Sequence, residues 1–329
     1  MQFRRTWLIA TALSLASWGG LWSSAVQAQQ YPSKPVRIIS PFPVGGGPDG
    51  VARLLADKLS REWGQSVVVE NRPGGNGFIA IDAFKRGDKN GYDILVVDNV
   101  HLAAYPSLFK QLPYDPVKDF DILLPLFKTY FFFTVGKDSP YQSVGQIIAD
   151  AKRRPGKLDF GSWSIGNPAH LGGELLESMA GIQMEHVIYK ETSQLYTSVA
   201  NNELAFALGT AATAGPLYRA GKLRLLAVTA SHRVATYPDV PTIVESGGPA
   251  GFEMTGWNVL AVPPGVPREV TDKIRSSVAR ALAADDIQEK FKSFGYEPFV
   301  ATAAEFNQFL AEETQRYSAV IKQANVSID

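Results

Sequence analysis

Residues 36–49 read VRIISPFPVGGGPD, a short apolar run followed by a loop rich in glycine and proline. The run 36–40 predicts a strand, and Asp49 marks the start of a helix with apolar residues on one side. Residues 67–70 predict a second strand, which runs into the glycine-rich loop 71–77 and a helix from about Phe78. Two such strands place both loops at the carboxyl edge of a parallel sheet, where open α/β sheets bind ligands.

The rest of the chain continues this alternation and adds a third loop at 163–169. The pattern predicts further strands at 94–98, 122–126, 130–135, 158–162, 185–189, 204–208, 223–229 and from 257, and further helices at 143–153, 170–180, 193–201, 268–283 and 303–324. We therefore expect an α/β protein with two lobes, joined by strands that return from one lobe to the other, and with the glycine loops facing the gap.

The composition excludes several function classes. The 329 residues are 45% hydrophobic and carry 32 basic and 32 acidic side chains, so there is no basic footprint for nucleic acid or an anionic membrane. Cysteine is absent, which excludes thiol catalysis, cysteine-ligated zinc and disulfides. Four histidines, no cluster of metal ligands and no dinucleotide fingerprint indicate neither a metal centre nor another cofactor.

The first 28 residues have the pattern of a secretory signal peptide. Arg4 and Arg5 precede an apolar run at 7–22, and a stretch of mostly small residues, typical of a signal-peptide cleavage site, ends at Ala28. An uncleaved membrane anchor is the alternative, but the run is short for a span and is interrupted by Gly19 and Gly20. The prediction is an exported protein of the periplasm, cleaved after about Ala28.

Blocks of sequence along the whole chain carry a family resemblance. They are 41–46 with Asp49, 64–74, 112–116 with Asp119 and Phe120, 155–158, His170 and Leu171 with Gly173 and Glu174, Tyr189 and Lys190, 221–229, and 238–242. With these blocks the sequence resembles the solute-binding receptors of tripartite tricarboxylate transporters, the Bordetella uptake gene family. Together they span about residues 31–325.

The resemblance implies a two-lobed periplasmic binding protein of type II fold with a ligand cleft between the lobes. Lobe 1 is expected at 31–132 and 233–329, and lobe 2 at 133–232. The family closes over a small carboxylated ligand and presents it to membrane transporter subunits, so we expect a monomer that binds and does not catalyse. An enzyme is also disfavoured by the sequence, because no Gly-x-Ser-x-Gly elbow occurs.

The resemblance places one ligand carboxylate between the first βα loop and the loop of the second lobe. Helix N-termini favour an anion there, and glycine lets the backbone come close. The candidate ligand-binding residues are Ser40, Phe42, Pro43, Gly45, Gly46, Phe78, Ser162, Trp163, Ser164, Asn167, His170 and Thr192. Asp49 is expected to have a structural role and Arg53 to pair with an acid, whereas His170 is predicted either to donate to the ligand or to cap its helix.

Departures from the family pattern bear on the ligand. Trp163 stands where small residues are usual, and Ala205 and Gly209 stand where acidic residues are frequent. With Phe42, Phe78 and Trp257, these changes favour an aromatic dicarboxylate such as terephthalate over an aliphatic di- or tricarboxylate or an amino acid. A sensor that engages a membrane kinase would use the same fold and cleft, and the sequence leaves this alternative to uptake open.

Overall fold

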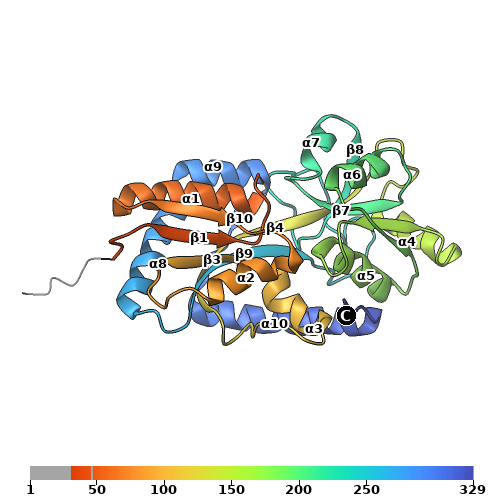
Figure 1. The fold of residues 1–329 in the computed structure, drawn as a ribbon. Helices are drawn as coiled ribbons and strands as arrows, with labels where there is room; N and C mark the ends of the chain where they lie inside the picture. Colours follow the sequence, from red (N-terminus) through yellow and green to blue (C-terminus); the bar gives the residue numbers. More distant parts are fainter. Residues whose placement is uncertain (1–30, 46, 329) are drawn as a thin grey trace, which may run out of the picture. The chain divides into compact units, whose positions relative to one another are not determined.

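The structure is a computed structural model, and it describes residues 31–45 and 47–328. The predicted signal peptide and Gly46 lie outside these residues. From Lys34 onward the described residues form one compact unit with an α/β fold. Figure 1 shows its strands with helices on both sides.

The first lobe is built on a mixed sheet with the strand order β2-β1-β3-β9-β4. β1 lies parallel to β2 and β3, whereas β9 runs antiparallel to β3 and β4 and β10 runs antiparallel to β4. The strands are β1 (Val36–Ser40), β2 (Val67–Asn71), β3 (Asp93–Asp98), β4 (Asp121–Gly136), β9 (Thr255–Val262) and β10 (Tyr296–Pro298).

The second lobe continues from the far half of β4 in the order β4-β7-β5-β6. β5 is parallel to β6 and β7, and β8 lies antiparallel on β4. The added strands are β5 (Asp159–Ser162), β6 (Glu185–Ile188), β7 (Phe206–Thr210) and β8 (Leu223–Val228).

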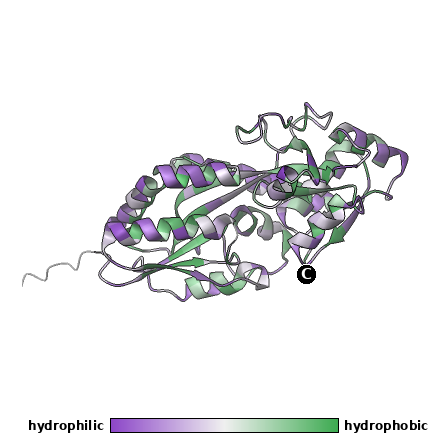
Figure 2. Ribbon diagram, turned by 90° about the horizontal axis from the view of Figure 1, so that it is seen from above, coloured by the Kyte–Doolittle hydropathy of each residue, from purple (hydrophilic) through white to green (hydrophobic). Residues whose placement is uncertain are grey.

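Helices cover both sheets. In the first lobe, α1 and α9 lie on one side of the sheet and α2 and α10 on the other (Figure 1). The helical elements are α1 (Gly47–Trp63), η1 (Gly75–Gly77), α2 (Phe78–Lys85), η2 (Val100–Ala104), α3 (Tyr105–Leu108), α4 (Val144–Arg153), α5 (Pro168–Ala180), α6 (Thr192–Ala200), α7 (Gly215–Arg219), α8 (Arg268–Leu282), α9 (Asp285–Phe294) and α10 (Ala303–Ala324). Figure 2 shows hydrophobic strands inside and hydrophilic residues along the helices, as burial of one helix face requires.

One long strand, β4, joins the two lobes. Tyr130 pairs with Thr255 of β9, and the next residue, Phe131, pairs with Thr210 of β7. The sequence predicted two strands here, at 122–126 and 130–135. That prediction was wrong because Lys128, which interrupts the apolar run, stays in the strand with its ammonium group 4.3 Å from the centre of the Phe299 ring.

Thr229 fastens the return of the chain between the lobes. The Phe131 N–H donates to Thr229 Oγ1 (2.9 Å), and this hydroxyl donates to the Met254 carbonyl (2.6 Å). After this point the chain stays against the second sheet: Val234 and Val240 belong to a buried cluster with Phe132. The lobe boundary predicted between residues 232 and 233 therefore falls within a segment that packs on the second lobe.

Candidate ligand-binding site

The carboxyl ends of β1, β2 and β3 lie at one edge of the first sheet. Because these strands are parallel and in register, with Ser40 opposite Asn71, the loops that follow them lie side by side. The Asn71 amide donates to the Phe42 carbonyl at 3.0 Å, which ties the β2 end to the β1–α1 loop. The sequence prediction that these loops share an edge is confirmed.

A buried carboxylate shapes the β1–α1 loop. Asp49 accepts hydrogen bonds from the Gly45 N–H (2.8 Å), from Arg53 Nε (2.9 Å) and from the Asn71 amide (2.8 Å). Burial alone would raise the pKa of Asp49, but these donors, Arg53 foremost, lower it below its usual value. The structural role predicted for Asp49 and the pairing of Arg53 with an acid are thus both confirmed.

The other predicted residues of this loop differ in exposure. Ser40 is fully buried and its hydroxyl accepts from the Phe42 N–H at 3.3 Å, whereas Phe42 is half-buried and Pro43 and Gly45 are exposed. Gly45 has a φ of 83°, a left-handed value that favours glycine. The accessible groups of this loop are therefore its backbone and part of the Phe42 ring, whereas Ser40 is buried under the loop.

The β2–α2 loop makes an unusual left-handed turn. Gly74, Gly75, Asn76 and Gly77 all have positive φ, between 53° and 100°. The Phe78 side chain that follows is half-buried in an aromatic cluster, with ring centres 5.9 Å from Tyr105 and 5.1 Å from Phe109. Phe78 thus packs on its own lobe, and its assignment to the ligand stays a prediction.

His101, which stands in none of the sequence motifs, lies at the same edge just after β3. Its Nδ1 is 2.5 Å from Asp98 Oδ1, and its Nε2 is a buried atom without a hydrogen-bond partner among the described residues. The available signal was its position, because a histidine directly after a strand that ends in Asp98 falls at the ligand edge of a parallel sheet.

In the second lobe, Ser162 and Asn167 interlock at the ends of β5 and α5. Asn167 is the N-cap of α5, and its Oδ1 accepts from the N–H groups of Ala169 (2.7 Å) and His170 (3.1 Å). Its amide group donates to Ser162 Oγ (2.9 Å) and to the Ser164 carbonyl. Cap and strand end are thereby fixed to each other.

Two buried or half-buried histidines, His170 and His186, contact the β5–α5 loop. His186 of β6 lies with Nε2 2.7 Å from Ser162 Oγ, and its ring centre is 4.0 Å from that of His170. Burial, with the neighbouring His170 second, lowers the pKa of His186 to about 4, so the ring is neutral at pH 7. Its Nε2 hydrogen-bonds to Ser162 Oγ, which itself donates to the Ser164 carbonyl at 3.0 Å. No local sequence signal marks His186, because only the pairing of β6 with β5 brings it beside Ser162.

Both ring nitrogens of His170 have partners within the protein. Nδ1 accepts from the Gly166 N–H (3.0 Å), and Nε2 is 3.3 Å from Glu174 Oε1. Of the two roles predicted for His170, the geometry favours holding the loop at the start of its helix. The loop it holds touches the first lobe, since Gly166 packs against Leu108 of α3 and against Ile328.

The remaining predicted residues lie around this loop. Trp163 is half-buried and packs against the cluster that contains Leu195 and Leu204, and Ser164 is half-buried beside it. Thr192 is the first residue of α6 and is also half-buried. The β1–α1 loop of the first lobe and the strand before it thus carry Ser40, Phe42, Pro43 and Gly45. The end of β5, the loop after it and the start of α5 carry Ser162, Trp163, Ser164, Asn167 and His170 in the second lobe.

Two residues that favoured an aromatic ligand in the sequence have structural roles. Trp257 is fully buried and its Nε1 donates to Glu313 Oε2 at 3.2 Å, so it belongs to the core of the first lobe and gives no support to an aromatic ligand. At Gly209 a Cβ would lie 2.5 Å from the Tyr196 hydroxyl. The packing of Tyr196 therefore accounts for the missing acidic side chain at position 209, whatever the ligand.

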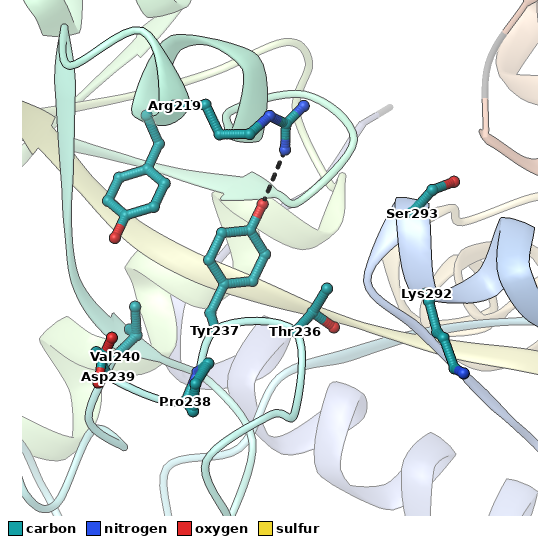
Figure 3. A pocket seen from close by; sticks show the side chains of 9 residues that line it. Arg219, Thr236, Tyr237, Pro238, Asp239, Val240, Lys292 and Ser293 are labelled. Atoms are coloured by element: carbon teal, nitrogen blue, oxygen red, sulfur yellow. Dashed lines mark hydrogen bonds between the residues drawn. The ribbon is translucent and has the colours of Figure 1, made fainter.

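The cavities that the described residues line include two away from these loops. The first, about 340 Å³, lies between α7, the 236–240 turn and the end of α9 (Figure 3). Figure 3 shows Arg219 donating to the Tyr237 hydroxyl across it, at 3.4 Å, with Lys292 and Ser293 on the α9 side. The second, about 730 Å³, is an apolar groove between α10 and the start of β4. None of the predicted ligand residues lines either cavity.

Over residues 31–45 and 47–328, no three acidic or histidine side chains are grouped to hold a metal ion. Within the same ranges, no helix has the length and apolar character needed to cross a membrane.

Comparison with known proteins agrees with this geometry. Residues 51–326 match the model of the family described as tripartite tricarboxylate transporter family receptor. A UPF0065 protein from the tcbD-tcbE intergenic region of Pseudomonas sp. strain P51 is 30% identical over 97% of this chain and 94% of its own length.

Two solved structures share the fold over nearly their whole length. Rpa4515 of R. palustris, solved with adipate, has 30% identity and a TM-score of 0.81, covering 90% of this chain and 99% of its own. The periplasmic binding protein BugD has 29% identity and a TM-score of 0.77, with the same coverage. The two-lobed binding-protein fold predicted from the sequence is confirmed.

Proposed function

Because this chain belongs to the tripartite tricarboxylate transporter receptor family, we propose that it is a monomeric periplasmic receptor that binds an aromatic dicarboxylate such as terephthalate and delivers it to membrane subunits. We further propose that lobe 1 comprises residues 34–130 and 255–328 and lobe 2 residues 131–254. The crossing at Tyr130 and the bonds of Thr229 to Phe131 and Met254 support these limits.

The proposed ligand lies between the β1–α1 loop and the β5–α5 loop. Each loop leads into the N-terminus of a helix of more than ten residues, α1 and α5, where the positive end of the helix dipole favours a carboxylate. The proposed contacts are the loop backbone from Phe42 to Gly46 and the group Ser162, Trp163, Ser164 and Thr192. Asn167 and His170 hold the second loop in shape.

The observation that carries the aromatic ligand is the half-buried indole of Trp163 on the β5–α5 loop. Phe42 offers a second half-buried ring on the other loop. Burying a benzene ring of about 100 Å² contributes roughly 2 to 3 kcal/mol at about 25 cal/mol per Å², and ring contacts add about 1 kcal/mol. Such a gain distinguishes an aromatic from an aliphatic acid.

Calorimetric titration of ligand-stripped residues 29–329 tests the proposal, with terephthalate, adipate, citrate and glutamate as ligands. We expect terephthalate to bind most tightly, and Trp163→Gly to weaken it about 10-fold or more while leaving adipate within about threefold. Unchanged terephthalate affinity in Trp163→Gly contradicts the aromatic-ligand proposal.

An aliphatic dicarboxylate is the second candidate, because the similar structure of Rpa4515 was solved with adipate. Tight binding of adipate and none of terephthalate would select it and keep the receptor function.

A further inference from the structure

The His101 imidazole is held rigidly but only on one side. Asp98 Oδ1 is 2.5 Å from Nδ1 and also accepts from the N–H groups of Val100 (3.1 Å) and His101 (3.2 Å). The side chain is 7% exposed, and Nε2 has no partner in the described part of the chain. Buried polar atoms are nearly always hydrogen-bonded, and leaving one unpaired costs about 1 to 3 kcal/mol.

Nε2 lies between the two first-lobe loops. It faces Gly77, where an added Cβ would collide with it, and the Phe42 ring centre is 6.5 Å from the imidazole. Residues 73–76, which precede Gly77 in this turn, are exposed to solvent. The turn that contains Gly77 therefore separates Nε2 from solvent. A ligand can reach Nε2 only if this turn moves.

The guanidinium groups near this edge are already paired. Arg53 binds Asp49 and Asn71, and Arg72 binds Glu70. The β1–α1 and β5–α5 loops are expected to hold one carboxylate with backbone N–H groups. A second carboxylate therefore requires a donor that these arginines do not supply.

We propose that His101 Nε2 donates a hydrogen bond to the second carboxylate of a dicarboxylate ligand, with Asp98 accepting from Nδ1. The pairing places the ring between two carboxylates, and His101 selects dicarboxylates over monocarboxylates. This inference rests on the proposed receptor function.

Titrations with matched acids test it. The ligands are terephthalate and benzoate, and adipate and hexanoate, and the proteins are wild type, His101→Phe, His101→Gln and the exposed control His232→Gln. We expect His101→Phe to weaken the dicarboxylate that wild type binds about 10- to 100-fold and its monocarboxylate partner by less than about threefold. His101→Gln should recover part of the loss, and His232→Gln should match wild type.

The outcomes separate this inference from the receptor proposal. If wild type binds none of the four acids, the receptor proposal fails and this inference with it. If wild type binds and His101→Phe keeps its dicarboxylate affinity, or loses both acids by the same factor, only the role of His101 is overturned.

A second measurement covers a variant that does not fold. In wild-type protein with ¹⁵N-labelled histidine, assigned with single variants at the other three histidines, dicarboxylate binding should shift the His101 Nε2 resonance. An unchanged resonance in the saturated protein overturns the proposal.

Discussion

Different interactions fix the ligand-side loops of the two lobes: a charged pair in the first lobe and hydrogen bonds between neutral groups in the second. In the first lobe the charged pair of Asp49 and Arg53 fixes the loop, and one imidazole nitrogen, His101 Nε2, is left without a partner among the described residues. In the second lobe, neutral groups bond one another: Ser162, Asn167 and His186. Under the proposals above, the second lobe would supply a fixed neutral loop, and the first lobe would supply one polar atom to the ligand.

Removing the charge at Asp49 should give the largest effect on stability. Asp49→Asn turns an acceptor of three donors into a group with one acceptor oxygen, so we expect the free energy of unfolding to fall by about 2 to 3 kcal/mol. Urea denaturation measures the change.

The same helix provides a matched control. Asp57 pairs with Arg61 four residues on, but its side chain is 54% exposed, against 2% for Asp49. Asp57→Asn should change the free energy of unfolding by less than about 0.5 kcal/mol. Equal effects of the two variants would show that the Asp49 pair does not hold the loop.

The neutral network should make the second lobe sensitive to acid. The folded pKa of His186, about 4, lies below its usual 6.5, so the unfolded chain binds a proton first as the pH falls. The stability contributed by neutral His186 is present above about pH 6.5 and is lost between pH 6.5 and 4, by up to about 2 kcal/mol given its partial exposure.

Unfolding of wild type and His186→Gln across this pH range measures that loss. We expect a shallower decrease in His186→Gln, and the wild-type slope in the exposed variant His232→Gln. A wild-type slope in His186→Gln as well would mean that other groups cause the acid sensitivity.

The cap of α5 should give a smaller effect. Asn167→Ala removes two backbone caps and the bond to Ser162, so we expect a loss of about 1 to 2 kcal/mol in the free energy of unfolding and weaker ligand binding. Ser143→Ala removes only the cap bond of α4 to Gln146 and should cost about 1 kcal/mol with unchanged binding. Weaker binding in Ser143→Ala would remove the link between the α5 cap and the ligand.

The positions of most strands and loops along the chain could be predicted from the sequence, because apolar runs and the glycines that separate them are local signals. Other elements lacked such signals: the polar helix α9 and the short strand β10 went unpredicted, since their packing on Phe127 of β4 defines them. Within the site, Asp49, Ser162 and Asn167 could be found because they stand at ends of predicted elements.

By itself the sequence determined the α/β class and the three loops, which follow from residues close together in the chain. It also determined the two lobes and the family, which follow from patterns and blocks of sequence along the whole chain. Only the tertiary structure decided that Trp257 is internal, that His186 supports Ser162 and that His101 has a nitrogen without a partner in the described part of the chain. These relations join residues on different strands, and sheet register together with side-chain packing sets them.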